Sequence, residues 1–280
     1  MDPTSIPEPQ IFLINLDRSA DRLAFITEQA ASLGFAFERI PAVDGRNLPD
    51  WLKSEFPADC KMGQGAIGCF ASHLLAAQAV VARALPFAII LEDDAELQPG
   101  FVSIAKTAIA ALPDNWDYLY FCSAGKKSVI RVCSIGSEHS VVRYTWAPAN
   151  TVAYALSNRG ARKRLAVMPR VRPIDIDNRF AWQQNLKIYG VFPAVVRQQR
   201  EFVSTIKGAG SGVRWEPSPL AMFAGYFWTI REVGVRNFFA AAFMNLVNSA
   251  RKRFDGIQRI AIISDLSGLN ARREPAHPDG

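Results

Sequence analysis

The chain has 280 residues, 49% of them apolar and 21% charged, so it is long and apolar enough to bury a sizeable core, and wholesale disorder is not expected. Its net charge of +6 conceals an asymmetry. Residues 1–117 hold 16 acidic and 8 basic residues, whereas residues 118–280 hold 10 acidic and 24 basic ones. The basic half predicts an anionic partner (a phosphorylated substrate, nucleic acid or an anionic membrane) or else a solubilising surface.

The cysteines and the N-terminus indicate a compartment. The four cysteines, at positions 60, 69, 122 and 133, form no C-x-x-C pair, so we expect a reducing compartment and neither a zinc site nor a thioredoxin-like motif. Residues 1–10 have no basic or apolar region of a signal peptide. We also expect no membrane-spanning segment, because the longest apolar run, 238–247, is shorter than the roughly 18 residues that a span needs.

The first half of the chain alternates strand-like and helix-like segments. An apolar run at 11–16 predicts a buried strand, Ser19 and Gly34 bound an amphipathic helix, and 35–40 predicts a second strand. This β-α-β opening favours a right-handed crossover and a parallel sheet. The pattern continues with a loop at 41–65, an Ala-rich helix at 65–85, a strand at 87–92, a helix at 101–112 and a strand at 116–122.

The second half is less regular. Its pattern predicts strands at 128–133, 140–146, 151–157 and 191–198, helices at 158–168 and 179–190, and an acid-rich turn at 172–178. We therefore expect an α/β domain at 1–215, a basic aromatic helical segment at 216–262 and a disordered polar tail at 263–280.

Three consecutive acids, Glu92, Asp93 and Asp94, follow the most apolar strand. Ligands of open α/β sheets bind at the carboxyl ends of the strands. Residues two apart on an extended chain share a face, so Glu92 and Asp94 would point one way and Asp93 the other. Carboxylates that meet there suit Mn²⁺ or Mg²⁺, which would offset their repulsion and clamp a diphosphate. The alternative is a solvated strand end or an acidic helix start.

A second stretch, INLDRSADR at 14–22, follows the first strand directly. It places Asn15, Asp17, Arg18 and Arg22 at the start of a helix, where the base, ribose or phosphates of a nucleotide would lie. The alternative is local, because its acids and arginines can pair with one another at the helix end.

A third stretch, GQGAIGCFASH at 63–73, sets glycines ahead of Ser72 and His73. The glycines indicate close approach of the backbone to a ligand or to the sheet. A lone histidine on an apolar helix is either a hydrogen-bonded core residue or a ligand. Because the chain has no G-x-G-x-x-G after its first strand, no Walker A sequence and no G-x-S-x-G, a dinucleotide oxidoreductase, a P-loop NTPase and a serine hydrolase are disfavoured.

In this order and at these spacings, FLINLDRSADR, GQGAIGCFASH and AIILEDDAEL resemble glycosyltransferase family 25 over about residues 10–100. PIDIDN at 173–178 and REFVSTI at 200–206 match the family's later pattern more loosely. The family includes bacterial lipopolysaccharide and lipooligosaccharide sugar transferases and the collagen galactosyltransferases. The resemblance implies a GT-A-like, Rossmann-type, mostly parallel sheet flanked by helices. It also implies a UDP-sugar donor such as UDP-galactose, a divalent cation (Mn²⁺ or Mg²⁺) and inversion at the anomeric carbon.

The resemblance also implies residue roles. Glu92 and Asp94 match the family's metal motif, with Asp93 beside them at the donor. His73 falls on the second motif, where it would contact the donor or hold the metal loop in place, and we count it among the catalytic residues. The other residues expected at the donor are Asn15, Asp17, Arg18, Arg22 and Ser72.

An inverting transfer needs a general base that takes the proton of the acceptor hydroxyl. Asp175 and Asp177 in PIDIDN are the candidates, and the alternative is that they are turn-forming residues after Pro173.

The basic aromatic stretch at 226–254 has two interpretations. As an amphipathic basic helix it would rest on an anionic membrane surface, which suits a transferase with a lipid-linked acceptor. Alternatively, its aromatic side chains pack onto the catalytic domain.

The sequence thus predicts a metal-dependent inverting glycosyltransferase that moves a hexose, most simply galactose from UDP-galactose, onto a glycan or glycolipid such as the lipopolysaccharide core. We expect it in the cytoplasm, at the inner face of the cytoplasmic membrane. The alternatives are a catalytically degenerate nucleotide-sugar-binding protein and a Mg²⁺-dependent nucleotidyltransferase. Nucleic acid is not an expected partner, because the basic residues are scattered and the acidic half holds the predicted site.

Overall fold

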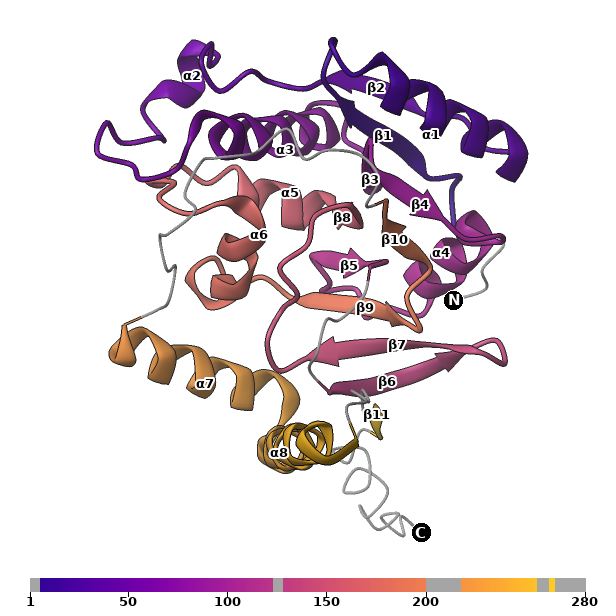
Figure 1. The fold of residues 1–280 in the computed structure, drawn as a ribbon, viewed down its shortest axis with the longest axis vertical. Helices are drawn as coiled ribbons and strands as arrows, with labels where there is room; N and C mark the ends of the chain where they lie inside the picture. Colours follow the sequence, from indigo (N-terminus) through magenta and orange to yellow (C-terminus); the bar gives the residue numbers. More distant parts are fainter. Residues whose placement is uncertain (1–5, 123–127, 200–217, 256–261, 265–280) are drawn as a thin grey trace, which may run out of the picture.

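The computed structural model describes residues 6–122, 128–199, 218–255 and 262–264. Within these residues the chain forms a nine-stranded mixed sheet flanked by helices, in the order β11-β6-β7-β9-β5-β8-β3-β1-β2 (Figure 1). The predicted α/β fold with helices on the sheet is confirmed. The predicted tail lies outside the described residues from 265 onward, as do REFVSTI and the expected domain boundary at 215.

The opening of the chain is the predicted β-α-β unit. β1 (Gln10–Asn15) lies between β2 (Glu38–Pro41) and β3 (Phe87–Glu92) and is parallel to both. The connections carry α1 (Ala20–Leu33), the short α2 (Asp50–Lys53) and the long α3 (Gln64–Ala82). Because β1 and β3 are parallel neighbours, their carboxyl ends meet at one edge of the sheet.

The middle of the chain makes the sheet mixed. β8 (Ala153–Ser157) lies between β3 and β5 (Tyr118–Tyr120) and is antiparallel to both. β6 (Val129–Ile135) and β7 (His139–Tyr144) form an antiparallel pair farther along the sheet. Two further elements leave the acidic end of β3, namely β4 (Ala95–Leu97) and α4 (Phe101–Ala110).

The remaining elements differ in part from the prediction. They are α5 (Asn158–Arg164), α6 (Ile174–Asp177), the 3-10 helix η2 (Asn178–Gln183), β9 (Ile188–Phe192), β10 (Val196–Gln198), α7 (Pro219–Val233), α8 (Val235–Asp255) and β11 (Ile262–Ser264).

Three predictions here were wrong. The single strand expected at 191–198 is divided, because residues 191–192 end β9 and residues 196–198 form β10. The acid-rich turn is instead the helical turn α6. The helix expected at 179–190 stops early, because Asn185 takes a positive φ of 50° and the next residues pair with β5 as strand β9. Pairing with a central strand thus overrides local helical spacing.

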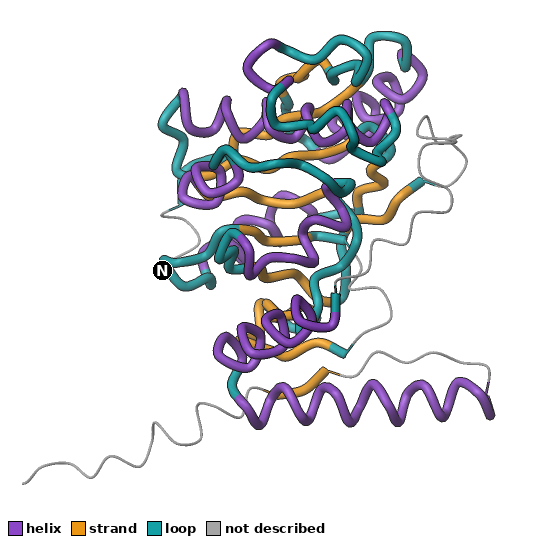
Figure 2. The backbone as a smooth tube through the Cα atoms, turned by 90° about the vertical axis from the view of Figure 1, so that its left-hand side faces the viewer, coloured by secondary structure: helices purple, strands orange, loops and turns teal. Residues whose placement is uncertain are grey.

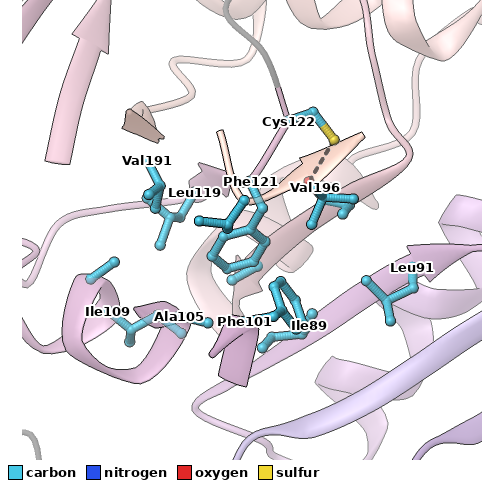
Figure 3. Packing of buried hydrophobic residues seen from close by; sticks show 14 of the residues in the cluster. Ile89, Leu91, Phe101, Ala105, Ile109, Leu119, Phe121, Cys122, Val191 and Val196 are labelled. Carbon is cyan, nitrogen blue, oxygen red and sulfur yellow. Dashed lines mark hydrogen bonds between the residues drawn. The ribbon is translucent and has the colours of Figure 1, made fainter. Parts of the chain in front are cut away.

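Residues of opposite parity on the central strands face opposite layers. On one face Leu13, Ile89 and Leu91 pack with α1 and α4, and Phe101 of α4 meets Phe121 edge-on with ring centroids 5.2 Å apart (Figure 3). On the other face Phe12 and Ile90 pack with α3 and α5. This alternation is what a sheet covered on both sides requires.

Helix α3 is the buried helix of the second face. It is 19 residues long, carries no Asp, Glu, Lys or Arg, and is apolar enough to cross a membrane by length and composition. The expectation that no segment meets this test was therefore wrong, because residues 64–82 form one apolar helix long enough to do so. Most of α3 is buried against β1, β2, β3 and α5, which is the environment of a core helix of the domain.

The third motif brings backbones together at Gly68, but the partner is the loop after β2, and not the sheet or a ligand as expected. A Cβ on Gly68 would lie 2.4 Å from the carbonyl oxygen of Val43, and one on Gly45 would lie 1.9 Å from that of Gln64. The loop after β2 therefore touches α3 directly, which leaves its residues beside the ends of β1 and β3.

The C-terminal helices pack onto the sheet at the end opposite β2, and Figure 2 shows α8 running along that end. α7 contacts η2, where Gly225 lies against the ring of Trp182, and Glu232 pairs with Arg143 and Lys187. α8 contacts β6 and β11, and Asn245 accepts a hydrogen bond from the backbone of Ser128. One face of the helical segment is thus part of the domain.

Gly68→Ala is expected to lower the free energy of unfolding by about 1–3 kcal/mol. The new methyl group would overlap the Val43 carbonyl, so α3 and the loop after β2 would have to move apart. Urea unfolding measures the change. Gly65→Ala, at the exposed start of the same helix, is the matched control and should leave stability unchanged or raise it. Equal effects of the two variants would contradict the close approach.

Candidate active site

A cavity of about 360 Å³ opens at the carboxyl ends of β1 and β3. It is formed by the turn after β1, the loop after β2, the start of α3 and the turn at Glu92, Asp93 and Asp94, which we call the acidic turn. The predicted site residues that line it are Asn15, Arg18, Arg22, Ser72, His73, Glu92, Asp93 and Asp94. This is the position at which open α/β sheets bind ligands. Asp17 lies outside this lining, and its largely exposed carboxylate pairs with Arg39.

The three acids separate at the end of β3, and each has different partners. Asp93 turns to the first motif. Its Oδ2 accepts a hydrogen bond of 2.8 Å from Asn15 Nδ2, and its Oδ1 lies 2.9 Å from Arg22 Nη1. All three side chains are buried, so Asp93 is a charge already neutralised by protein groups.

Glu92 turns to the second motif. Its Oε1 accepts a 2.5 Å bond from Thr151 and lies 3.2 Å from Nε2 of His73, whose Nδ1 lies 2.8 Å from the Tyr154 hydroxyl. Because a carboxylate only accepts, Nε2 donates to Glu92. Burial alone would raise the pKa of Glu92, but the bonds from His73 and Thr151 leave it below its ordinary value. His73 thus positions Glu92.

Asp94 is the least satisfied of the three. Its Oδ2 accepts a 2.9 Å bond from Gln198 of β10, while its buried Oδ1 has no hydrogen-bond partner among the described residues. Burial and the charge of Glu92 raise the pKa of Asp94 to about 6. A buried carboxylate oxygen left without a partner is costly unless something binds it.

These donors fit a divalent cation. Asp94 offers its unpaired oxygen, Glu92 is an ionised carboxylate in the same cavity, and oxygen ligands are those that Mn²⁺ and Mg²⁺ prefer. Cys69, His73 and Glu92 also place ligand atoms within 4.8 Å of one another, a softer set. We favour the carboxylates, because burial raises the pKa of the Cys69 thiol well above its usual range and His73 already donates to Glu92.

Two arginines that share one acidic partner also line the cavity. Arg18 lies 3.8 Å from Asp44, and Arg46 forms a 2.5 Å pair with the same carboxylate. Ser72 fixes the loop that holds Asp44 and Arg46, because its Oγ accepts a hydrogen bond of 2.8 Å from the backbone N–H of Val43. The cavity is therefore lined by arginines as well as by Glu92, Asp93 and Asp94.

The two predicted bases have different surroundings. Asp177 is buried and paired with Arg164 and Arg172, and it lines neither this cavity nor its neighbour. It anchors α6. Asp175 is on the same helical turn but lines the neighbouring cavity, so only Asp175 faces open space beside the site.

Several site residues were missed by sequence reasoning. Gln198 and Thr151 contact the acids from elements far along the chain, and Tyr154 reaches His73 from β8. None has a local motif, because the sheet order brings them there. The arginine of the loop, Arg46, stands in VDGR, where a short polar turn after a strand was the available signal.

The family comparison agrees with this geometry. The model of glycosyltransferase family 25, described as an LPS biosynthesis protein family, matches residues 8–179, which include the three motifs and the acidic turn. Because the match covers more than half of the chain, the domain is a glycosyltransferase domain. The chain belongs to glycosyltransferase family 25.

Curated relatives carry the same family name. A glycosyltransferase 25 family member of Aedes aegypti is 30% identical over 185 residues, which is 60% of this chain and 29% of that protein. The inactive glycosyltransferase 25 family member 3 of Mus musculus is 28% identical over 186 residues, 60% of this chain and 30% of that protein. The chain thus matches about a third of the length of these relatives.

A solved structure is similar at lower identity. It is a glycosyltransferase involved in the glycosylation of the major capsid of PBCV-1, with 14% identity and a TM-score of 0.31 over 56% of this chain and 64% of that one.

Asp94→Asn is expected to stabilise the metal-free protein at neutral pH. The folded pKa of about 6 lies above the ordinary 3.8, so the folded state binds the proton more tightly and loses stability as the pH rises from about 4 to about 6. Above pH 6 the ionised carboxylate costs about 3 kcal/mol, which the amide removes. Urea unfolding in EDTA at pH 7.5 and pH 4 should show this gain only at pH 7.5, and Glu96→Gln, at the exposed residue of β4, should show none. A gain of the same size at pH 4 would contradict the raised pKa.

Proposed function

We propose that the protein is a metal-dependent inverting glycosyltransferase that moves a hexose, galactose from UDP-galactose in the simplest case, onto a surface glycan such as the lipopolysaccharide core. The observation that supports this most directly is the buried Oδ1 of Asp94, which has no hydrogen-bond partner among the described residues, in a cavity that Glu92 and arginines also line. A nucleotide sugar has a diphosphate that needs both kinds of group.

The donor would lie in the cavity, with its diphosphate near the acids and the arginines that line it. Arg18 and Arg46 offer charge to the phosphates, and Asn15, held by Arg39 and Asp93, presents a fixed turn at the end of β1. A divalent cation bound by Glu92 and Asp94 would neutralise the charge that develops on the leaving diphosphate. His73 and Thr151 hold Glu92 in place for that role.

Asp175 is the general base that fits this arrangement. It lies on α6 beside a cavity that shares Glu92 with the donor cavity. The acceptor oxygen forms a bond to the anomeric carbon, the bond from that carbon to the diphosphate breaks with its electron pair, and the acceptor proton passes to the Asp175 carboxylate. Burial raises the pKa of Asp175, which favours proton uptake.

An inactive nucleotide-sugar-binding protein is the second candidate, because relatives of this family in mouse and human are named inactive. In this chain the three acids and their partners are all present, which favours turnover. The cytoplasm, where nucleotide sugars would reach the site, is the proposed location.

Asp94→Ala should reduce the Mn²⁺-dependent release of UDP from UDP-galactose by about 100-fold or more, because it removes the carboxylate proposed to hold the cation. Coupled detection of UDP measures the rate, and thermal stabilisation by UDP-galactose with and without Mn²⁺ measures binding. Glu96→Ala, exposed on the neighbouring strand, is the control and should retain the rate. Full turnover by Asp94→Ala would refute the metal assignment.

Asp175→Asn separates the steps. It should bind UDP-galactose as the wild type does and lose transfer to acceptor by roughly 100-fold or more. UDP binding without any transfer in the wild type would support the inactive candidate, and release of pyrophosphate would support a nucleotidyltransferase.

A further inference from the structure

A second cavity, of about 280 Å³, adjoins the first and has a different chemistry. The two share the lining residues Cys69, Glu92 and Gln198, so they meet at the acidic turn. The second cavity is enclosed by two chain segments that the first does not use, residues 149–152 ahead of β8 and 173–176 in α6. A ligand there would touch the end of a donor held in the first cavity.

The charge of the two cavities differs. Arginines line the first, at positions 18, 22 and 46. Among the described residues that line the second, none is Lys or Arg, and its polar groups are the carboxylates Glu92 and Asp175, the amides Asn150 and Gln198, and the Thr151 hydroxyl. Carboxylates and amide oxygens accept hydrogen bonds from hydroxyl groups, whereas they repel phosphates and carboxylates.

The walls are rigid where the ligand would lie. Ile174 is buried with Phe70 and Leu52, and Asp177 is tied to two arginines, so α6 is anchored on both sides of Asp175. Asn150 accepts a 2.8 Å bond from the backbone of Val152, which fixes the other segment. Apolar side chains such as Ala149 and Ile176 complete the lining and suit the faces of a sugar ring.

We propose that this second cavity is the acceptor site and that it takes the uncharged, hydroxyl-rich terminal sugar of a glycan rather than a phosphorylated or acidic residue. The proposal rests on the proposed function, since it places the acceptor hydroxyl between Asp175 and the donor cavity. To the proposed function it adds the chemical class of the acceptor sugar and the chain segments that select this sugar.

The test is direct binding, independent of turnover. With UDP and Mn²⁺ present, methyl β-galactoside or methyl β-glucoside should shift the ¹³C-methyl resonance of Ile176, and glucose 6-phosphate should bind at least tenfold more weakly. Ala149→Leu fills the cavity and should weaken glycoside binding at least tenfold with UDP-galactose affinity unchanged. Val167→Leu, exposed elsewhere, is the matched control and should change neither.

Binding of the phosphorylated sugar as tight as that of the neutral ones, no shift with either glycoside, or unchanged binding in Ala149→Leu would overturn the acceptor site. These results leave donor binding intact. If the wild type did not bind UDP-galactose at all, the proposed function would be overturned instead. Failure of the acceptor site and failure of the proposed function are therefore distinguishable.

An independent observation concerns the outer face of α7 and α8. Both helices bury one side against the domain, through Gly225, Thr229 and Val233 in α7 and through Asn237 and Ala241 in α8. On the opposite side, helical spacing aligns large apolar side chains that are 58–81% exposed, namely Leu220, Phe223 and Phe227 on α7 and Val235, Phe239, Phe243 and Leu246 on α8. So many exposed apolar side chains on two packed helices mark an interaction surface.

The charge of these helices favours one occupant. Between positions 219 and 254 the only acidic residue is Glu232, and it is paired with Arg143 and Lys187. Arg231 and Arg236 are exposed, and Arg, Lys and Arg follow at positions 251–253. A second copy would bring the same positive charge to this face, whereas an anionic bilayer accepts both the basic and the aromatic groups.

We infer that the outer face of α7 and α8 docks on an anionic membrane surface. The full chain should sediment with vesicles containing 30% phosphatidylglycerol and not with pure phosphatidylcholine, and binding should weaken as salt rises. Replacing Phe227, Phe239 and Phe243 together by Glu should reduce binding at least tenfold, while Val167→Glu, an equally exposed apolar residue elsewhere, should not.

Equal binding by the triple variant, or no binding by the wild type, would overturn the membrane surface. Sedimentation velocity without lipid adds a further outcome. A dimer of the wild type that the triple variant loses would assign the face to a second copy instead.

Discussion

The buried contact of Asp93 with Arg22 and Asn15 is the constraint on which the site depends. Three adjacent carboxylates at the end of a buried strand repel one another, and this contact neutralises one of them within the protein. It also ties the turn after β1 to the turn after β3, so the two parallel strands end at a fixed geometry. A buried ion pair of this kind adds little net stability, and its value lies in position.

The sequence predicted the parts of the site that are local. An acidic run after an apolar strand, a polar run after the first strand and a glycine-rich helix start each have a signal within about ten residues, and all three line one cavity. The separate directions of the three acids do not follow from strand alternation, because β3 ends at Glu92 and Asp93 and Asp94 lie in the turn after it. The close backbone approach at Gly68 was predictable in kind, although its partner, the loop after β2, was not.

What the sequence could not predict depends on the order of strands in the sheet. Gln198 reaches Asp94 only because β10 pairs with β4, and the strand nature of Ile188 depends on its pairing with β5. Asp175 and Asp177 share a motif, and only packing shows that one anchors and the other faces a cavity. The positive charge of the second half also overstates the charge available to an anionic partner. Arg164 and Arg170 are buried in ion pairs with Asp177 and Glu55.

The pairing of β10 with β4 sets a minimum length for a working unit. Gln198 supplies the hydrogen bond to Asp94, and the backbone of Gln199 donates to the same residue, yet both stand beyond residue 179, where the family match ends. A fragment cut at that boundary would keep the three N-terminal motifs and lack the strand that carries Gln198. During synthesis the acidic turn would likewise lack this strand until about 100 further residues had left the ribosome, so the site is assembled late although its motifs are made early.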